Sequence, residues 1–412
     1  MRVRSALSLL LSSTAVFIAS CADETTNTVD TVPAKPPQME APKLTQNVIE
    51  VTEAELEGNP FLVEWETPYS VPPFDAIEDA HFMPAIKAGI IRLREEVAAI
   101  VAQEEEPTFA NTVVALEVSG ELLSKVSSTF GNITSTDTND TLRTLEGEIY
   151  PILTSEYDAI RFNDDLFGRI KKVYEQKDEL GLDEQDARLL ELTYREFVRA
   201  GADLDTSTKA RVAEINSELS SLTTEFAQNL LTATTGFQLE LTSEEDLSGL
   251  SESFKAAIKD DDEDKWLVGL NRSPFETFMT QSTNRELRQK LFDAYRLRAS
   301  GGDDDNGPLL VKIAQLRAER AELMGYKSHA HYQLEPRMAK TPEAAEAFLL
   351  KVWAPGLARA KEELGDIQAL INEEGNNFTA AGHDWWHYAE KVRQARYAFD
   401  DALLAPYFEL GA

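Results

Sequence analysis

Residues 285–332 constrain the fold most strongly, because they read as two amphipathic helices joined by an acidic loop. The apolar residues at helical spacing are Leu287, Leu291 and Ala294 in the first helix and Leu309, Ile313, Leu316 and Leu323 in the second. Each set forms a stripe that has to be buried against another element. The segment GGDDDNG, residues 301–307, separates the two helices.

Similar stripes elsewhere predict that the chain is mainly α. They comprise Ile86, Ile90, Leu93, Val97 and Ile100, and then Val212, Ile215, Leu219, Leu222 and Phe226. Thr341-Pro342 predicts a helix start, and Pro355 is expected to kink or divide the helix that follows. Alternating apolar residues predict short strands at 237–241 and 266–270. No repeat of fixed period is present, which disfavours a solenoid.

The residues within these two helices also resemble a known family, the zinc oligopeptidases that include peptidyl-dipeptidase Dcp, oligopeptidase A and thimet oligopeptidase. The matching residues are Arg285, Leu287, Ala294, Tyr295, Arg298, Ala299, Asp305, Asn306, Leu316, Arg317, Ala321, Leu323, Gly325 and Tyr326. Further matching segments are Asn59-Pro60-Phe61-Leu62, Pro72-Pro73-Phe74-Asp75, 192–202, 341–345, 388–391 and 406–410. Several of these segments favour the Dcp branch.

The resemblance implies a fold and an activity. The fold would be mainly α, an elongated multi-helix wall of a channel-type zinc oligopeptidase with at most a few short strands. Such a channel admits unfolded oligopeptides and excludes folded proteins. The intact enzyme would release dipeptides from the carboxyl terminus of oligopeptides, with a zinc-bound water attacking the peptide and a Glu as general base. We expect it to be a monomer.

The motif that carries this chemistry is missing from the chain. In the family, H-E-x-x-H on a helix supplies two zinc ligands and the general base, and a further Glu is the third ligand. The sequence has five His but no H-E-x-x-H. Because the family's motif follows the segment that matches 406–410, we expect a truncated chain without its catalytic half. We assign no catalytic, cofactor or zinc-binding residue here, and we expect no dipeptide release from this polypeptide alone.

Charge and length limit the other functions. The chain of 412 residues has a formal net charge of −32, so it should repel nucleic acid phosphates. Serine hydrolase, P-loop and dinucleotide-binding motifs are absent from the sequence. A rival hypothesis is a non-catalytic, lipid-anchored protein that binds peptides or acts as a scaffold. If a catalytic half is missing, apolar helix faces should be exposed and should promote aggregation.

The amino terminus predicts export and lipid attachment. Residues 1–20 form a secretory signal, with Arg2 and Arg4 before an apolar run that is too short for a confident transmembrane helix. The signal ends at Ile18-Ala19-Ser20-Cys21, which resembles a bacterial lipobox and makes Cys21 the lipidation site. The alternative is an ordinary cleaved signal with an incidental cysteine. Ala22 lacks the inner-membrane retention signal of an Asp, so we expect an outer-membrane anchor facing the periplasm.

Composition then divides the rest of the chain. Residues 21–58 are rich in Thr, Pro and Asp and predict a flexible tether. Residues 59–412 are expected to form the helical amino-terminal part of a peptidyl-dipeptidase-like enzyme.

Histidine pairs are the remaining candidates for a metal site. His383 and His387 are four residues apart, so a helix would place them on one face, where they could bind zinc. The family has aromatic residues at these positions, which favours packing or surface roles. His329 and His331 are two apart and diverge on a helix, so a solvated edge is favoured. Nothing in sequence near His81 suggests a role.

The acidic loop was also tested as a calcium site. An EF-hand needs oxygen ligands at positions 1, 3 and 5 and Gly at position 6. Counting from Asp303 places Gly307 at position 5 and Pro308 at position 6, so the pattern fails. A loop between helices is favoured, and residues 260–264 read as a solvated loop in the same way.

Overall fold

The computed structural model describes residues 48–261, 264–397 and 407. These residues all belong to one unit, which spans residues 41–412. The predicted signal at residues 1–20, Cys21 and most of the predicted tether lie outside the described residues, as do all but Tyr407 of residues 406–410. Within the described ranges, no helix is both long enough and apolar enough to cross a membrane.

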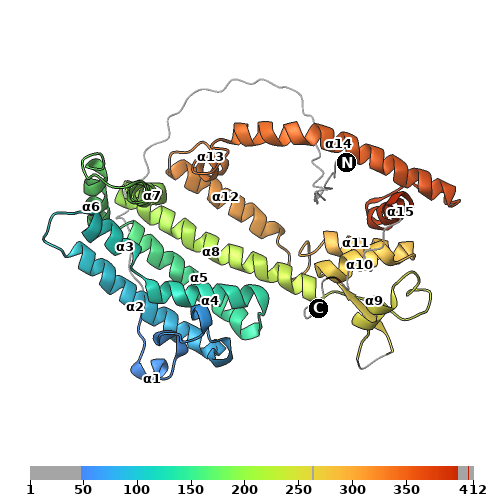
Figure 1. Cartoon of the computed structure of the whole chain (residues 1–412), viewed down its shortest axis with the longest axis horizontal. Helices are drawn as coiled ribbons and strands as arrows, with labels where there is room; N and C mark the ends of the chain where they lie inside the picture. Colours follow the sequence, from blue (N-terminus) through green and yellow to red (C-terminus); the bar gives the residue numbers. More distant parts are fainter. Residues whose placement is uncertain (1–47, 262–263, 398–406, 408–412) are drawn as a thin grey trace, which may run out of the picture. The chain divides into compact units, whose positions relative to one another are not determined.

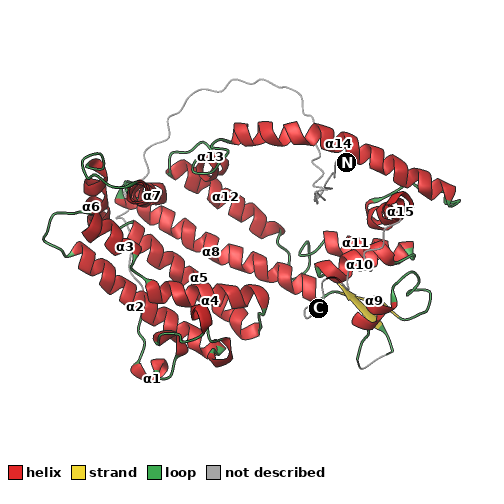
Figure 2. Ribbon diagram, viewed as in Figure 1, coloured by secondary structure: helices red, strands yellow, loops and turns green. Residues whose placement is uncertain are grey.

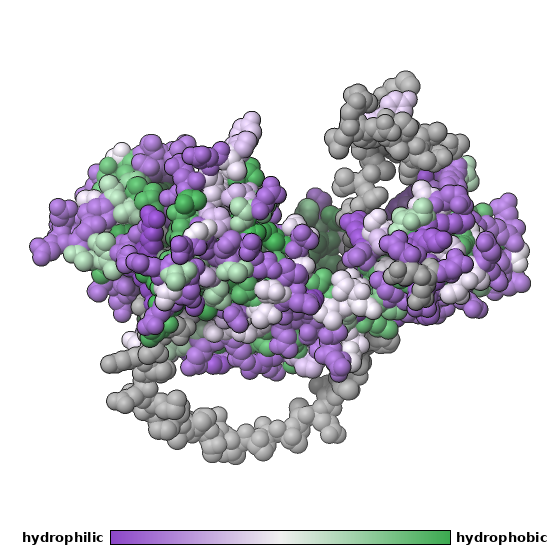
Figure 3. Space-filling model, turned by 90° about the horizontal axis from the view of Figure 1, so that it is seen from below, coloured by the Kyte–Doolittle hydropathy of each residue, from purple (hydrophilic) through white to green (hydrophobic). Residues whose placement is uncertain are grey.

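Helices dominate the described region, which confirms the mainly α class (Figures 1 and 2). The α-helices are α1 (Glu53–Leu56), α2 (Phe82–Val101), α3 (Ala115–Glu117), α4 (Glu121–Thr136), α5 (Asp140–Arg161), α6 (Asp164–Glu175), α7 (Glu184–Ala200), α8 (Thr206–Thr235), α9 (Glu252–Ala257), α10 (Arg272–Gln281), α11 (Arg285–Arg296), α12 (Gly307–Leu323), α13 (His329–Leu334), α14 (Pro342–Glu373) and α15 (Trp385–Tyr397). The strands are β1 (Gln238–Leu241) and β2 (Trp266–Gly269). Hydrophilic residues predominate on the face drawn in Figure 3.

Local sequence sets many of the helix starts. Four successive helices, α5 to α8, follow an Asn or Asp whose side chain accepts a hydrogen bond from the first turn: Asn139, Asn163, Asp183 and Asp205. Thr341 caps α14 in the same way, with Oγ1 3.1 Å from the Ala344 nitrogen. The predicted start at Thr341-Pro342 is therefore confirmed.

The first core lies mainly between α2, α4, α5 and α6. The predicted stripe on α2, from Ile86 to Ile100, is buried in it. Gly89 allows α2 and α4 to approach, because a Cβ there would lie 2.9 Å from the Leu123 Cα. Ile49 also packs against this core, and α1 begins at Glu53. The described residues at the end of the range 21–58 thus include a short helix and a core contact.

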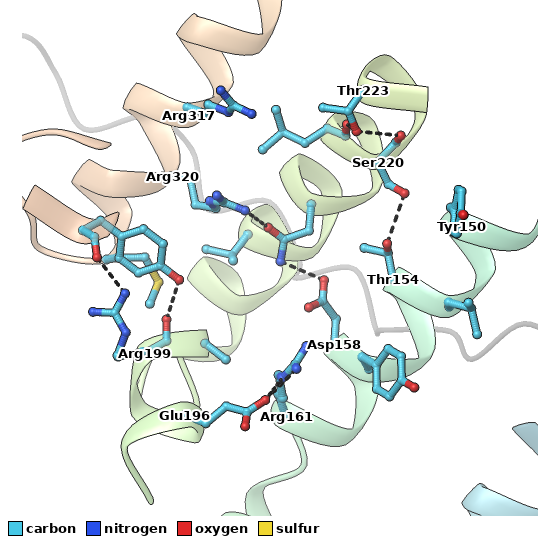
Figure 4. A pocket seen from close by; sticks show the side chains of 18 of the residues that line it. Tyr150, Thr154, Asp158, Arg161, Glu196, Arg199, Ser220, Thr223, Arg317 and Arg320 are labelled. Carbon is cyan, nitrogen blue, oxygen red and sulfur yellow. Dashed lines mark hydrogen bonds and ion pairs between the residues drawn. The ribbon is translucent and has the colours of Figure 1, made fainter. Parts of the chain in front are cut away.

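Helix α8 contacts α5 and α12. Ile215 and Leu219 of α8 pack with Ile313 and Leu316 of α12 in a separate apolar cluster. The predicted stripes of these two helices are thus partners of each other. Polar side chains of α5, α8 and α12 line a common cavity, which Figure 4 shows from close by.

The second core is built around the two predicted strands. β1 and β2 pair antiparallel, with Leu239 opposite Val268, and both of these side chains are fully buried. Helices α9, α10 and α11 contribute Phe254, Phe278 and Leu291 to the same core. Both strand predictions and the buried face of the first amphipathic helix are confirmed.

Helix α14 is not divided at Pro355, although division was one of the two outcomes expected there. Pro355 lies inside it, and the helix continues without division over 32 residues. Its carboxyl end packs on α15 through Ile367 and Ile371. In contrast, large apolar side chains from the first half are exposed, including Leu349 (65%) and Trp353 (50%).

Candidate functional site: an arginine-lined cavity

A cavity of about 1150 Å³ lies in the described part of the chain. Its walls come from α5, α7, α8 and α12, and Tyr332 of α13 also lines it (Figure 4). Pockets that hold drug-sized ligands typically enclose ~300–1,000 Å³. This cavity is therefore large enough for a short peptide.

Charged side chains are concentrated in this cavity. Its lining includes Arg161, Arg195, Arg199, Arg317 and Arg320, together with Glu146, Asp158 and Glu196. Arginine thus outnumbers acidic residues here, although the chain as a whole carries a charge of −32. The cavity lining is therefore richer in arginine than the chain as a whole.

Carboxylates neutralise three of these arginines. Arg161 Nη2 lies 2.6 Å from Glu196 Oε1. Arg195 Nη1 lies 3.6 Å from an oxygen of Glu191, which is on the same helix. Arg199 pairs with Glu335, and its Nη2 donates to the Tyr332 carbonyl at 2.7 Å. These contacts tie α7 to α5 and to the end of α13.

A buried polar relay crosses the cavity from α5 to α12. Asn216 of α8 donates from Nδ2 to Asp158 Oδ2 at 2.8 Å and accepts from Arg320 Nη1 at 2.8 Å. Burial raises the pKa of Asp158 to about 6, although the hydrogen bond from Asn216 opposes this shift. The amide of Asn216 therefore separates the Asp158 carboxyl from the Arg320 guanidinium.

A smaller cavity of about 320 Å³ adjoins this region and shares Arg317 and Arg320. His329, the first residue of α13, also lines it, and its Nδ1 is buried without a hydrogen-bond partner among the described residues. Burial lowers the pKa of His329, and the charges of Arg317 and Arg320 lower it further. His329 is thus half-buried, whereas we had predicted a solvated edge.

His331, the second histidine of the pair with His329, has different partners. His331 Nδ1 lies 2.8 Å from Ser328 Oγ, and its Nε2 lies 3.5 Å from Glu343 Oε1. The two rings therefore have separate partners, as their spacing predicted. His81 Nδ1 accepts a hydrogen bond from the Glu78 backbone nitrogen at 2.9 Å, a purely local contact.

His383 and His387 do not share a helix. His383 lies in the 3₁₀ turn η6 (Gly382–Asp384), and His387 lies in the first turns of α15. His387 Nδ1 lies 3.1 Å from the Thr280 carbonyl oxygen, and burial lowers its pKa to about 4. Both side chains are buried, at 7% and 6% exposure.

Asp384, between the two histidines, accepts hydrogen bonds from two arginines and a backbone nitrogen. Its carboxylate is fully buried and accepts from Arg285 Nη2 at 2.9 Å, from Arg288 Nη2 at 3.1 Å and from the Ala381 nitrogen at 3.0 Å. Burial alone would raise its pKa, but the hydrogen bonds from Arg285 and Ala381 hold the pKa below the usual value. Asp384 therefore clamps η6 to α11.

The described residues do not fit a zinc centre. Across residues 48–261 and 264–397, no three or more His, Cys, Asp or Glu side chains are grouped so that they could hold a metal ion. His383 and Asp384 are committed to packing and to the arginine clamp. We therefore assign the family's zinc to no residue described here and derive no step through it.

Asn306 holds the acidic loop in place. Asn306 is buried, donates from Nδ2 to the Phe226 carbonyl at 3.0 Å and accepts from Asn229 Nδ2 at 3.1 Å. Asp305 Oδ1 accepts from the Gly307 nitrogen at 3.0 Å. The loop between α11 and α12 is therefore fixed to α8, in agreement with the interpretation as an inter-helix loop.

The arginines of the cavity were not singled out as a site by the sequence. They come from three helices that are far apart in the chain, so no local spacing connects them. In the sequence, Arg317 was notable only as one of the residues that match the zinc oligopeptidase family. The signal that could have identified it is the lack of an acidic residue three or four positions away on α12.

Comparison with known proteins supports a peptidase family. The sequence profile of Peptidase family M3 matches residues 278–412. Dipeptidyl carboxypeptidase of Escherichia coli (strain K12) is 37% identical over 358 residues, which are 85% of this chain and 53% of that protein. Oligopeptidase A of Salmonella typhimurium is 28% identical over 359 residues, which are 85% of this chain and 52% of that protein.

A plant protein gives a similar result. Organellar oligopeptidase A of Arabidopsis thaliana is 27% identical over 373 residues, which are 87% of this chain and 46% of that protein. The chain thus spans about half the length of the curated relatives it matches. The predicted resemblance is confirmed, since the similarity extends over most of the chain. Residues 278–412 thus match Peptidase family M3, and most of the chain is similar to a dipeptidyl carboxypeptidase and to oligopeptidases A.

Proposed function

We propose that this chain is part of a zinc metallopeptidase that releases dipeptides from the carboxyl terminus of oligopeptides. The observation that carries the proposal is the 37% identity with a dipeptidyl carboxypeptidase along 85% of the chain. The cavity of about 1150 Å³ supports a role in holding a peptide. In this proposal the described helices form one wall of the peptide-binding channel.

The polypeptide of 412 residues would bind peptide without cleaving it. Its sequence contains no H-E-x-x-H, and the described residues offer no group that fits zinc. Hydrolysis would then require residues of a longer protein. The contribution of this part is to bind, position and select the peptide.

The decisive experiment begins with the gene. The DNA after codon 412 should continue the reading frame into H-E-x-x-H. The longer protein should release dipeptides from a peptide with a free carboxyl terminus, and a chelator should abolish the release, as mass spectrometry of the products would show. Chelator-sensitive dipeptide release by the 412-residue polypeptide alone would overturn the division of roles. A longer protein without dipeptide release would overturn the proposed activity.

The second candidate is a non-catalytic, lipid-anchored protein that binds peptides. The arginine-lined cavity favours it, because binding requires no zinc motif. A stop codon directly after codon 412, together with peptide binding and no hydrolysis, would support this candidate over the enzyme.

We also propose that Cys21 anchors the protein in the bacterial envelope, in the outer membrane facing the periplasm. The support is the sequence Ile18-Ala19-Ser20-Cys21 after a secretory signal. Labelling of cells with radioactive palmitate should mark the protein, and Cys21→Ser should remove the label and release the protein from the membrane fraction. Equal labelling of both proteins would disprove the anchor.

A further inference from the structure

Arg317 and Arg320 differ from the other arginines of the cavity. Among the described residues, no carboxylate lies within ion-pair distance of either guanidinium, whereas Arg161, Arg195 and Arg199 each have one. In Figure 4 both side chains extend from α12 into the cavity, and no dashed line reaches Arg317. Two positive charges thus stand one helical turn apart without a direct ion pair, and Asn216 separates Arg320 from Asp158.

The sequence of α12 explains why neither Arg317 nor Arg320 has an ion pair within its own helix. The residues three and four positions from either arginine are apolar, apart from the arginines themselves: Ile313, Ala314, Leu316, Ala321, Leu323 and Met324. No neighbour on α12 can therefore form the usual intrahelical ion pair. Like charges at this spacing repel each other, so the arrangement costs free energy in the unliganded protein.

The hydrogen-bonding capacity of Arg320 is also incompletely used. Nη1 donates to Asn216, but Nε is buried without a partner among the described residues. His329 adds a second buried nitrogen without a partner at the same place, where the two cavities meet. Arg317 is exposed, so a molecule that enters from solvent can reach the pair. The unfilled donors and the two charges match one kind of ligand, an anion with two acceptor oxygens.

We propose that Arg317 and Arg320 form a subsite that binds a carboxylate of an oligopeptide. The planar guanidinium presents parallel N–H donors that fit a carboxylate better than an ammonium group does. The adjoining cavity of about 1150 Å³ then accommodates the rest of the peptide. This inference rests on the proposed function, from which it takes the peptide nature of the ligand. The carboxylate belongs either to the peptide's carboxyl terminus or to an Asp or Glu side chain.

Binding of labelled peptides to the 412-residue polypeptide tests the subsite. Fluorescence anisotropy would measure the affinity for fluorescein-labelled tetra-alanine with a free carboxyl terminus and for its carboxyl-terminal amide. We expect the free acid to bind roughly ten- to a hundredfold more tightly, because a charged hydrogen-bonding pair is lost in the amide. If an amidated peptide containing Glu binds as well as the free acid, the side chain is the source of the carboxylate. Equal affinity of the acid and of an amide without acidic residues would overturn the proposal.

Substitutions identify the groups that bind the carboxylate. Arg317→Gln and Arg320→Gln should each weaken binding of the free acid about tenfold or more and leave the weak binding of the amide unchanged. Arg317→Lys and Arg320→Lys retain the charge and should restore part of the affinity, which separates a binding role from loss of folding. The matched control is Arg272→Gln on α10, because Arg272 is exposed and pairs only with Glu276 on its own helix.

Small anions complete the test. Phosphate and acetate are added as competitors of the labelled peptide. If either displaces the peptide at a concentration no higher than the concentration of unlabelled tetra-alanine that displaces it, the site is a simple anion site and the peptide subsite is disproved. The measurement needs no hydrolysis. The subsite proposal can therefore be disproved even if a longer protein releases dipeptides, and it can be supported even if no dipeptide release is found.

Discussion

The guanidinium of Arg288 and the carboxylate of Asp384 form a buried ion pair, with 3.1 Å between Nη2 and Oδ1. Both side chains are almost completely shielded, at 1% and 0% exposure. Arg288 also donates to the Ser282 carbonyl at 2.8 Å, so α10, α11 and η6 meet at one charge cluster. The cluster joins two segments that are 96 residues apart in the chain.

Removal of one partner should destabilise this region strongly. Asp384→Ala leaves Arg288 buried without a carboxylate, and we expect a loss of about 3–5 kcal/mol in the free energy of unfolding. Urea unfolding followed by tryptophan fluorescence measures it, since Trp385 and Trp386 are adjacent. The control is Glu276→Ala, which removes the exposed pair with Arg272 and should cost less than about 1 kcal/mol. Equal losses in both variants would contradict the structural role of Asp384.

The buried carboxyl of Asp158 should make stability depend on pH. Its folded pKa of about 6 exceeds the usual Asp pKa of 3.8, so the folded protein binds the proton more tightly than the unfolded chain does. The free energy that the protonated Asp158 carboxyl contributes to folding is fully present below about pH 4 and is lost as the pH rises to about 6. Asp158→Asn should therefore gain about 3 kcal/mol relative to the parent between pH 4 and pH 7.

Urea titrations at several pH values would test the Asp158 prediction. Thr154→Val is the matched control on the same helix, because it removes a hydrogen bond to Ser220 of 3.1 Å and no titratable group. Its difference from the parent should be the same at all pH values. A difference for Asp158→Asn that is also constant from pH 4 to pH 7 would refute the prediction.

Asn306 should be more important for stability than the acidic residues beside it. Asn306→Asp cannot donate to the Phe226 carbonyl, and it buries a charge where an amide was bonded on both sides. We expect a loss of roughly 1–3 kcal/mol in the free energy of unfolding, measured by thermal or urea denaturation. Asp303→Asn alters an exposed position of the same loop and should change stability by less than about 0.5 kcal/mol. If Asp303→Asn is the more damaging change, Asn306 is not the anchor of the loop.

The exposed apolar residues of α14 should make the isolated polypeptide associate with itself. Leu349 and Trp353 are four residues apart and lie on the same side of the helix. The double substitution Leu349→Gln and Trp353→Gln preserves helix propensity and should reduce the association, as sedimentation velocity or light scattering over a range of concentrations would show. The control pair, Lys351→Gln and Lys361→Gln, removes no apolar surface and should not reduce it. A parent protein that stays monomeric at all concentrations would contradict this expectation.

Local sequence patterns predicted much of the fold. The stripes on α2, α8, α11 and α12, the two strands and the Thr341 cap depend on residues within one or two turns of each other. Such patterns are visible in one dimension, because helical and strand periodicities determine which side chains face the core. The helix is not divided at Pro355, since the loss of one backbone hydrogen bond is tolerated within a helix of 32 residues.

The candidate site was much less predictable. Local sequence did not indicate the role of Asp384, because its partners Arg285 and Arg288 lie in a segment about 100 residues earlier. The relay of Asp158, Asn216 and Arg320 likewise joins three helices. Their proximity depends on how the helices pack, which single-sequence periodicity does not determine.

The division of the buried apolar residues into separate cores has a consequence for how this protein loses its structure. Backbone amides of α2 and α4 should exchange with heavy water at rates set by the first core, and those of β1 and β2 at rates set by the second core. A peptide seated between α5, α8 and α12 would slow exchange in those helices and leave the strands unaffected. A single melting temperature would therefore not describe the stability of both cores. Hydrogen exchange measured residue by residue would show which of the two cores responds to the ligand.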